Sequence, residues 1–309
     1  MSGGAAAPAR AASGTAEAIA LLVLAVLLFG TAWPAMKSGL GDATPVWYAA
    51  ARAAVSGGAA LLLVAATRRL AVPSRADWPI ILSVGTGQLA GFFTLANLGL
   101  GYVPASRAVV LAYTTSIWLV PIGTLFLGER LGRWRLAGLA SGLAGVAVLF
   151  NPAALDWTDG RVVVGNLFLV AAALSWSLAI VHARTHRWHL SPLQVLPWQM
   201  GWAALLLAVA GLLVEPAGHV GLSATALAPL AYIGIVVGPA GTWAATSVSR
   251  ALPTIVTSLG FLAVPAVGIL ASTLVLGEPV TPSLALGAGL VIGGAVLVSL
   301  STLRPGAAR

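Results

Sequence analysis

Ten stretches of predominantly apolar residues follow one another along this chain, and they constrain its fold more than any other feature. Each is about 18 to 25 residues long, enough for an α-helix to cross the roughly 30 Å hydrocarbon core of a bilayer. We therefore expect an all-α integral membrane protein with ten transmembrane helices, at 17–37, 45–67, 78–99, 103–127, 132–150, 162–184, 192–213, 224–249, 253–276 and 281–303.

The composition agrees with a lipid solvent. Of the 309 residues, 59% are hydrophobic and 8% are charged, against about 45–50% and about 25% in soluble domains. Runs such as LLVLAVLLF at 21–29 do not alternate between apolar and polar residues, which argues against the strands of a membrane β-barrel. The short connections leave no room for a soluble catalytic domain, so we expect a protein that is not an enzyme.

Charge is distributed by loop parity, which indicates topology rather than nucleic-acid binding, although the net charge is +8. If the N-terminus is cytoplasmic, the opposite side holds only Lys37 and Arg161 as basic residues, together with five acidic ones. The positive-inside rule then predicts a multi-pass protein of a bacterial-type inner (plasma) membrane with both termini cytoplasmic. The basic residues on that inner side are Arg10, Arg68, Arg69, Arg75, Arg130, Arg133, Arg135, Arg184, Arg187, Arg250, Arg304 and Arg309.

The two halves of the chain share landmarks at a nearly constant offset. Pro45 and Pro192 are 147 residues apart, and each follows a basic residue by eight positions. Further along the offset is 149, and it relates Pro104 to Pro253, Thr124 to Thr273, the Leu-Gly-Glu run at 127–129 to that at 276–278, Gly138 to Gly287, and Gly145 to Gly294. The sequence thus predicts an internal repeat.

Because each predicted unit has five spans, an odd number, the second unit enters the membrane from the opposite side. We expect two inverted five-helix repeats at 17–150 and 162–303, joined by an extracytoplasmic linker at 151–161. A disordered tail at 1–16 and a short tail at 304–309 complete the predicted organisation. Inverted repeats of this kind place the substrate path at the interface of the two halves.

These residues carry a resemblance to a known family. The opening helix reads LLFGTAWPAMK, the second begins PVWYAAAR, and a Gly-Glu turn followed by a Gly-rich helix occurs once in each half, at 126–150 and 274–298. The chain resembles the EamA-type transporters of the drug/metabolite transporter (DMT) superfamily over essentially 17–303. It departs from the family pattern at Phe29, where Trp is common, and at Gln199, which stands where the first half has Arg52.

The resemblance implies a basket-like bundle in which the third, fourth, eighth and ninth helices surround a central cavity. It also implies export of small metabolites, with amino acids, including aromatic ones, as the substrate class of one branch. We expect a small-molecule substrate, the lipid bilayer as the surrounding partner, and no nucleic acid. Glycine pairs on the fifth and tenth helices, Gly138 with Gly142 and Gly289 with Gly293, predict close packing, and to a lesser degree a homodimer surface.

Nine residues are candidates for contacting the substrate. The cations could meet a carboxylate, although snorkelling or pairing with helix-end carbonyls would also explain them. The polar side chains could hydrogen-bond to the substrate and the aromatic ones could form apolar walls, whereas helix packing accounts equally for each alone. They are Lys37, Arg52, Gln88, Phe92, Tyr113, Trp176, Trp243, Thr246 and Ser258.

Acidic residues are missing from the centre of every predicted span, and only His182, near the inner end of its helix, could relay protons. This favours alternating access without an intramembrane carboxylate, as facilitated movement or exchange. Glu129 and Glu278 each follow a glycine, Gly128 or Gly277, that can end one helix in the left-handed conformation, and both glutamates are interpreted as caps at the start of the next helix. We expect no cofactor and no metal, and the chain has no cysteine. A passive channel or a lipid translocator of the same fold stays open as an alternative.

Overall fold

The computed structural model describes residues 6–128, 132–150 and 160–301. These residues are helical apart from turns, connections and one isolated bridge between Ala43 and Val220. The helices are α1 (Ala6–Gly39), η1 (Leu40–Asp42), α2 (Pro45–Ala66), α3 (Trp78–Ser83), η2 (Val84–Gly91), α4 (Phe92–Tyr102), α5 (Ala105–Ala112), α6 (Thr115–Leu127), α7 (Arg133–Leu149), α8 (Gly160–Thr185), α9 (Pro192–Val214), α10 (Ala224–Ala231), η3 (Tyr232–Gly241), α11 (Thr242–Ala251), α12 (Thr254–Phe261), α13 (Val264–Leu276) and α14 (Pro282–Ser301).

Nine helical segments within the described residues are long and apolar enough to cross a membrane. Several join consecutive elements, as α3, η2 and α4 do over Trp78–Tyr102, and α10, η3 and α11 do over Ala224–Ala251. In the chain, α7 lies between the fourth and fifth of these segments and is 17 residues long. Large apolar side chains are exposed on many helices, for example Leu62 at 73%, Leu125 at 79% and Leu213 at 78%. This pattern fits a helical, multi-pass membrane protein whose outer surface meets lipid.

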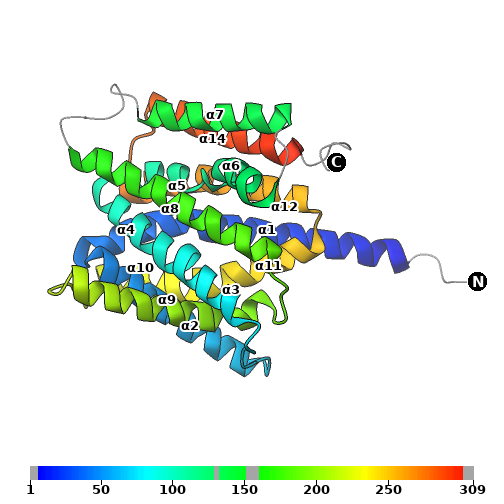
Figure 1. Ribbon diagram of the computed structural model, residues 1–309, viewed down its shortest axis with the longest axis horizontal. Coiled ribbons are helices and arrows are strands. Elements are labelled where there is room, and N and C mark those ends of the chain that lie inside the picture. Colours follow the sequence, from blue (N-terminus) through cyan, green and yellow to red (C-terminus); the bar gives the residue numbers. More distant parts are fainter. Residues whose placement is uncertain (1–5, 129–131, 151–159, 302–309) are drawn as a thin grey trace, which may run out of the picture.

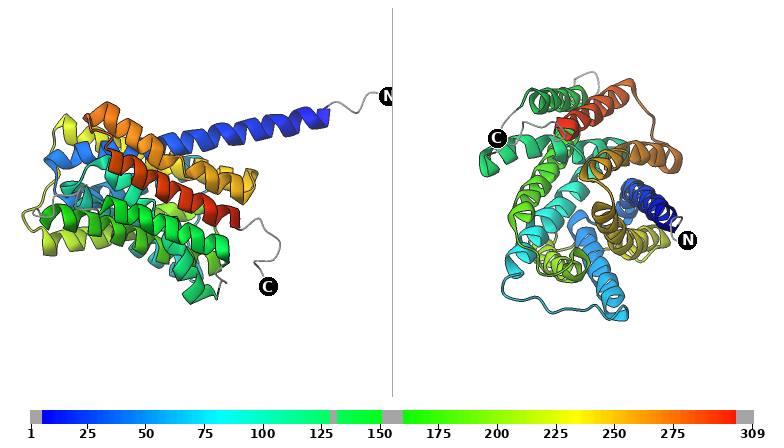
Figure 2. Two further views of the ribbon diagram at one scale, coloured as in Figure 1. Left: turned by 90° about the horizontal axis from the view of Figure 1, so that it is seen from above. Right: turned by 90° about the vertical axis from the view of Figure 1, so that its right-hand side faces the viewer.

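The observed bounds agree with the predicted windows to within a few residues, with one clear difference at the N-terminus. There α1 begins at Ala6, so that most of the stretch expected to be a disordered tail, 6–16, is helical. Figure 2 shows this end of α1 projecting beyond the rest of the bundle. The apolar pattern of 17–37 predicted the part of α1 that packs, whereas Ala-rich residues before it have high intrinsic helix propensity and extend the helix outward.

Two helix pairs lie at opposite edges of the bundle, α7 with α14 and α2 with α9 (Figure 1). Between these edges, α1 packs against α13, α11 and η3, while α8 packs against α6, α4 and η2. The pairs α2 with η3 and α9 with η2 complete the central packing. Each of these contacts has a counterpart in the other half of the chain.

The pair α7 and α14 packs antiparallel through glycines. A Cβ atom at Gly138 would lie 2.6 Å from the carbonyl oxygen of Gly294, and one at Gly145 would lie 2.8 Å from that of Gly287. Between them, the Ser141 hydroxyl donates to the carbonyl of Leu290 at 2.9 Å. The absence of a side chain lets the two backbones approach this closely, as the predicted packing role of Gly138 and Gly142 requires. No neighbour lies within 4 Å of a Cβ built at Gly289 or Gly293.

Two π-helical segments, η2 and η3, occur at corresponding places in the two halves. Both are rich in glycine, and η3 also contains Pro239, which cannot donate a backbone hydrogen bond. In η2 the carbonyl of Gly87 accepts from the backbone N–H of Phe92 and also accepts a hydrogen bond of 2.7 Å from the Ser175 hydroxyl of α8. Such π segments often mark functional positions in helices, and the sequence pattern did not reveal either one.

Gly128 and Gly277 end α6 and α13 in the left-handed conformation, with φ of 65° and 69°. A residue with a Cβ is strained there, which explains the glycine of both Gly-Glu turns. The interpretation of the glutamate is wrong for Glu278, however. Its carboxylate accepts hydrogen bonds from the backbone N–H groups of Ala105 at 2.7 Å and Ser106 at 2.8 Å, so it caps α5 rather than α14. Glu129 lies outside the described residues.

Candidate functional site

Arg52 of α2 lies among aromatic side chains inside the bundle. Its guanidinium carbon is 4.0 Å from the centre of the Phe93 ring, and Nη1 donates to the sulfur of Met36 at 2.8 Å. The face of an aromatic ring attracts a cation, and the attraction strengthens where water is excluded. Within the part of the chain that the structure describes, no carboxylate lies within 4.0 Å of this guanidinium. Arg52 therefore offers a positive charge whose closest contacts among the described residues are a ring and a thioether.

Phe92 connects this arginine to further aromatic residues. Its ring centre lies 4.7 Å from that of Trp176, 6.3 Å from that of Trp33 and 6.4 Å from that of Phe93, in tilted or edge-on geometries typical of aromatic pairs. We refer to Trp33, Met36, Arg52, Phe92, Phe93 and Trp176 as the Arg52 cluster. Its residues belong to α1, α2, α4 and α8. The cluster therefore includes residues from both halves of the chain.

Lys37 is engaged at one end of the bundle, where α4 ends. Its ammonium group donates to the carbonyls of Leu100 and Val103, the latter at 3.1 Å. These carbonyls have no partner inside a helix that stops at Tyr102, so a cation stabilises them. The structure thus gives Lys37 partners within the protein and does not place it in the Arg52 cluster.

Two carboxylates accept hydrogen bonds from helix N-termini at the same end of the bundle, which we call the Lys37 end. Glu278 caps α5, as described above, and Glu215 accepts hydrogen bonds from the N–H groups of Val46 at 3.1 Å and Trp47 at 3.3 Å at the start of α2. Each helix N-terminus has unpaired N–H donors and a positive dipole end, so a carboxylate is its natural partner. In addition, Asn97 of α4 donates to the carbonyl of Pro45 at 3.0 Å. These bonds join elements of both halves and close this end.

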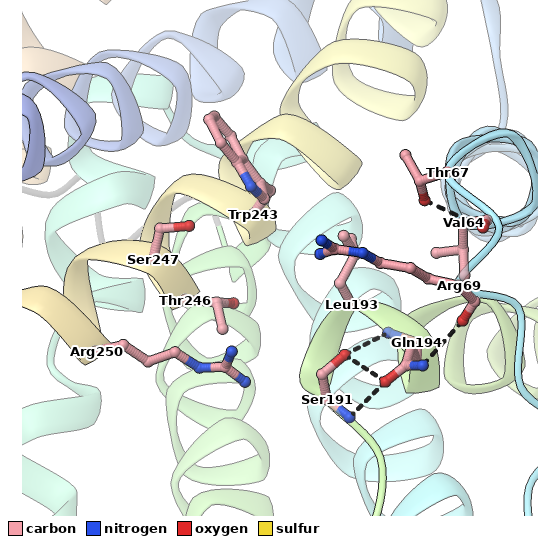
Figure 3. A pocket seen from close by; sticks show the side chains of 10 residues that line it. All are labelled: Val64, Thr67, Arg69, Ser191, Leu193, Gln194, Trp243, Thr246, Ser247 and Arg250. Carbon is pink, nitrogen blue, oxygen red and sulfur yellow. Dashed lines mark hydrogen bonds between the residues drawn. The ribbon is translucent and has the colours of Figure 1, made fainter.

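The opposite end, which we call the Arg250 end, contains a pocket of about 120 Å³ between α2, α9 and α11. Figure 3 shows Arg69 and Arg250 extending into it from opposite walls. Two of the predicted substrate residues, Trp243 and Thr246, lie on its α11 wall. The lining residues are Val64, Thr67, Arg69, Ser191, Leu193, Gln194, Trp243, Thr246, Ser247 and Arg250.

The pocket walls are held by hydrogen bonds at the start of α9. Ser191 and Gln194 form a capping box, in which the Gln194 carboxamide oxygen accepts from the Ser191 N–H at 3.0 Å. The amide nitrogen of Gln194 donates to the carbonyl of Arg69 at 2.9 Å and so ties the end of α2 to α9. Thr246 donates to the carbonyl of Thr242 in its own helix, which leaves the α11 wall without a bond to α9 from this residue.

The remaining predicted residues lie apart from these two groups. Gln88 lies in η2, Tyr113 lies at the break between α5 and α6, and Ser258 lies in α12. Tyr113 packs against a hydrophobic cluster that includes Val248 and Val264, and also against the larger hydrophobic cluster that contains Trp33 and Met36. The nine candidates therefore divide into Arg52, Phe92 and Trp176 in one cluster, Trp243 and Thr246 at the pocket, Lys37 at the closed end, and three separate residues.

Several residues of both groups were not among the sequence candidates. Trp33 and Met36 are three positions apart on α1 and so share a face, and Phe93 follows Phe92, which could have suggested an aromatic lining. Trp243, Thr246 and Arg250 have helical spacing as well, but Arg250 was explained by topology alone. The approach of Arg69 to Arg250 depends on packing and has no sequence signal.

His182 takes part in neither group. Its Nδ1 lies 2.6 Å from the Ser83 hydroxyl, and its ring centre lies 5.8 Å from that of His186. Further toward the Arg250 end, Asp77 accepts hydrogen bonds from the Ser74 N–H and hydroxyl, at 2.9 and 2.7 Å, and lies 3.4 Å from Nδ1 of His189. The Ser74 hydrogen bonds are the main cause that lowers the pKa of Asp77 below its ordinary value of about 4.

The chain was also compared with known proteins. The profile of the EamA-like transporter family matches it twice, over residues 16–151 and 163–300. The chain belongs to the EamA-like transporter family. This EamA-like protein is therefore a membrane transporter by family, and its relatives are transporters rather than enzymes.

Named relatives and a solved structure align with this EamA-like transporter over most of its length. The transporter YvbV of Bacillus subtilis is 28% identical and covers 90% of each chain. A protein of Salmonella typhimurium named "Probable amino-acid metabolite efflux pump" is 28% identical and covers 90% of this chain and 91% of its own. A crystal structure that is 26% identical superposes with a TM-score of 0.63 and covers 93% of this chain and 99% of that one.

Proposed function

We propose that this transporter exports small metabolites, namely amino acids including aromatic ones, by alternating access between two inverted five-helix halves. The proposed halves are residues 17–150 and 162–303, with 151–161 as an extracytoplasmic linker and short tails at 1–16 and 304–309. The proposal includes ten transmembrane helices, with α7 as the tenth. A helix of 17 residues spans about 25 Å, enough for most of the hydrocarbon core.

Paired features of the two halves support the inverted repeat. The left-handed glycines 128 and 277 are 149 residues apart, and the π segments correspond as well. The same offset relates Gly138 to Gly287 and Gly145 to Gly294. It therefore maps the contact between Gly138 and Gly294 onto the contact between Gly287 and Gly145. An antiparallel pair that maps onto itself in this way is what a pseudo-two-fold axis through α7 and α14 produces.

The Arg52 cluster carries the substrate proposal. A partly buried guanidinium with no carboxylate partner among the described residues is costly, and a substrate carboxylate would offset that cost. The rings of Phe92 and Trp176 would then lie beside the body of an aromatic or apolar amino acid. The metabolite named for the Salmonella relative has the same chemical class.

We further propose that transport needs no intramembrane carboxylate. The described acidic residues of the spans lie near their ends, as Glu17, Asp42, Glu215 and Glu278 do, and the last three accept hydrogen bonds from backbone or hydroxyl donors. Exchange or facilitated export fits this placement. The Arg250 end, with its many arginines, is proposed to face the cytoplasm of a bacterial-type inner membrane.

The test is counterflow in proteoliposomes loaded with unlabelled tryptophan, using a panel of labelled amino acids, riboflavin and inorganic ions outside. Saturable, trans-stimulated uptake of one or more amino acids is expected, and it should be lost in Arg52→Gln and kept in Arg75→Gln, an exposed arginine outside the cluster. Unsaturable flux would instead support the alternative of a passive channel, and scrambling of labelled phospholipid would support a lipid translocator. Absence of any amino-acid flux would refute the substrate proposal.

A further inference from the structure

The pocket at the Arg250 end concentrates positive charge without an acidic residue in its lining. Arg69 comes from the connection after α2 and Arg250 from the last turn of α11, and both guanidinium groups extend into the same small space (Figure 3). Among the described residues, neither side chain has a carboxylate within 4.0 Å or a hydrogen-bond acceptor. Two like charges that converge in one pocket repel each other, whereas an anion between them would be bound by both.

The rest of the lining fits an anion too. The N-terminus of the 23-residue helix α9 opens at Ser191, so its dipole adds positive potential at the same place. The hydroxyl group of Ser247 supplies a further donor in the wall, whereas that of Thr67 donates to the carbonyls of Leu63 and Val64. Apart from Val64 and Leu193, every lining side chain, including the indole N–H of Trp243, is of a type that can donate a hydrogen bond.

The size of the pocket limits what it can hold. Pockets for whole drug-sized ligands measure about 300–1,000 Å³, whereas this one measures about 120 Å³. It has room for a carboxylate or phosphate group but not for an amino acid with a large aromatic body. The remainder of a ligand would have to extend past Trp243, whose side chain is 45% exposed.

From these observations we infer that the pocket is a binding site for the oxyanion group of a ligand, a carboxylate or a phosphate, held between Arg69 and Arg250. The site is distinct from the Arg52 cluster and does not require that amino acids are the transported substrate. The oxyanion can come from a soluble anion or from the headgroup of an anionic lipid, because this end of the bundle lies where helices leave the apolar layer.

The inference is tested by thermal unfolding of the purified full chain in a neutral detergent. One arm adds inorganic phosphate against chloride at matched ionic strength, and the other adds phosphatidylglycerol against phosphatidylcholine. The variant is Arg69→Gln with Arg250→Gln. The matched control is Arg75→Gln with Arg187→Gln, which removes the same charge from exposed arginines of the same end that do not line the pocket.

We expect a rise in unfolding temperature of several degrees with at least one probe, which is kept in the control and lost in the Arg69/Arg250 variant. A response to phosphate assigns the site to soluble anions, and a response to phosphatidylglycerol alone assigns it to lipid. The inference is overturned if neither probe stabilises the protein, or if the Arg69/Arg250 variant, shown to be folded by its unliganded transition, responds like the control. Counterflow of amino acids is measured separately, so failure of one proposal leaves the other standing.

Discussion

The two ends of this transporter are built from corresponding residues but differ in packing. At the Lys37 end, Asn97 bonds to the carbonyl of Pro45 and joins α4 to α2. The offsets that relate the halves carry Asn97 to Thr246 and Pro45 to Pro192, at the Arg250 end. There Thr246 bonds within its own helix, and a pocket lies between α11 and α9. Hydrogen bonds thus join neighbouring helices at the Lys37 end, which we call the closed end, whereas the Arg250 end, which we call the open end, contains a pocket.

The two ends differ in what their charged side chains contact. The closed end has three charged side chains, Lys37, Glu215 and Glu278, that satisfy helix termini of neighbouring elements. At the open end two charges, Arg69 and Arg250, face a pocket instead. Charge-assisted hydrogen bonds are worth roughly 1.5–3 kcal/mol each, so these bonds stabilise the packing of helices at the Lys37 end.

The largest effect is expected from Arg52, which lies between the two ends. Arg52→Gln removes the charge proposed to bind the substrate carboxylate in either conformation, so counterflow should fall at least tenfold, whereas Arg52→Lys should retain part of it. Initial rates in proteoliposomes measure this. Equal rates for Arg52→Gln and the wild type would show that the cluster is structural.

The closed and open ends can be compared directly because the chain has no cysteine. Ser106→Cys, at a site 2% exposed beneath Glu278, should react with a maleimide at least tenfold more slowly than Ser247→Cys in the pocket. Both substitutions are nearly isosteric, and the bond at Ser106 uses its backbone N–H. Equal labelling rates in detergent would contradict the assignment of open and closed ends.

The closure itself should weaken in Glu278→Gln. The neutral amide loses the charge that the N-terminus of α5 favours, about 1.5 kcal/mol or roughly tenfold in the closed population. Labelling of Ser106→Cys should accelerate accordingly in the Glu278→Gln background, while labelling of Ser247→Cys should not. Unchanged labelling of Ser106→Cys would show that other contacts hold this end.

The close glycine contacts between α7 and α14 can be tested by adding a single methyl group. Gly145→Ala places a Cβ 2.8 Å from the carbonyl oxygen of Gly287, which should destabilise the pair α7 and α14 by about 1–3 kcal/mol. Gly289→Ala on α14 meets no neighbour within 4 Å and should be neutral or stabilising. The order of the two unfolding temperatures decides the point, and a more stable Gly145→Ala would refute close packing there.

The smallest effect concerns Asp77 at the Arg250 end. Its folded-state pKa is lowered, mainly by the Ser74 hydroxyl, so its contribution to stability is present above its ordinary pKa of about 4 and is lost as the pH falls from that value through the lower folded-state pKa. Asp77→Asn should flatten the fall in unfolding temperature between about pH 5 and 3. An unaltered pH profile would show that Asp77 does not titrate in this way.

The sequence predicted much of this structure and little of its site. Apolar windows marked the helices because a segment in lipid must satisfy its own backbone, which a local pattern can reveal. Gly277 was also recognised correctly as a helix end. The partner of Glu278, by contrast, lies 173 residues away at Ala105, and the local pattern suggested the adjacent helix instead. The projection of α1 from Ala6 and the two π segments were likewise missed.

By itself, the sequence determined that this chain is a multi-pass helical transporter of the EamA-like family, because hydropathy and motif spacing are properties of neighbouring residues. Only the tertiary structure decided that Arg52 lies over Phe93, that Lys37 holds helix-end carbonyls, and that Arg69 and Arg250 share a pocket. These contacts join residues from helices far apart in the chain. Which side chains meet there depends on helix rotation and register, which are fixed by packing rather than by any single segment.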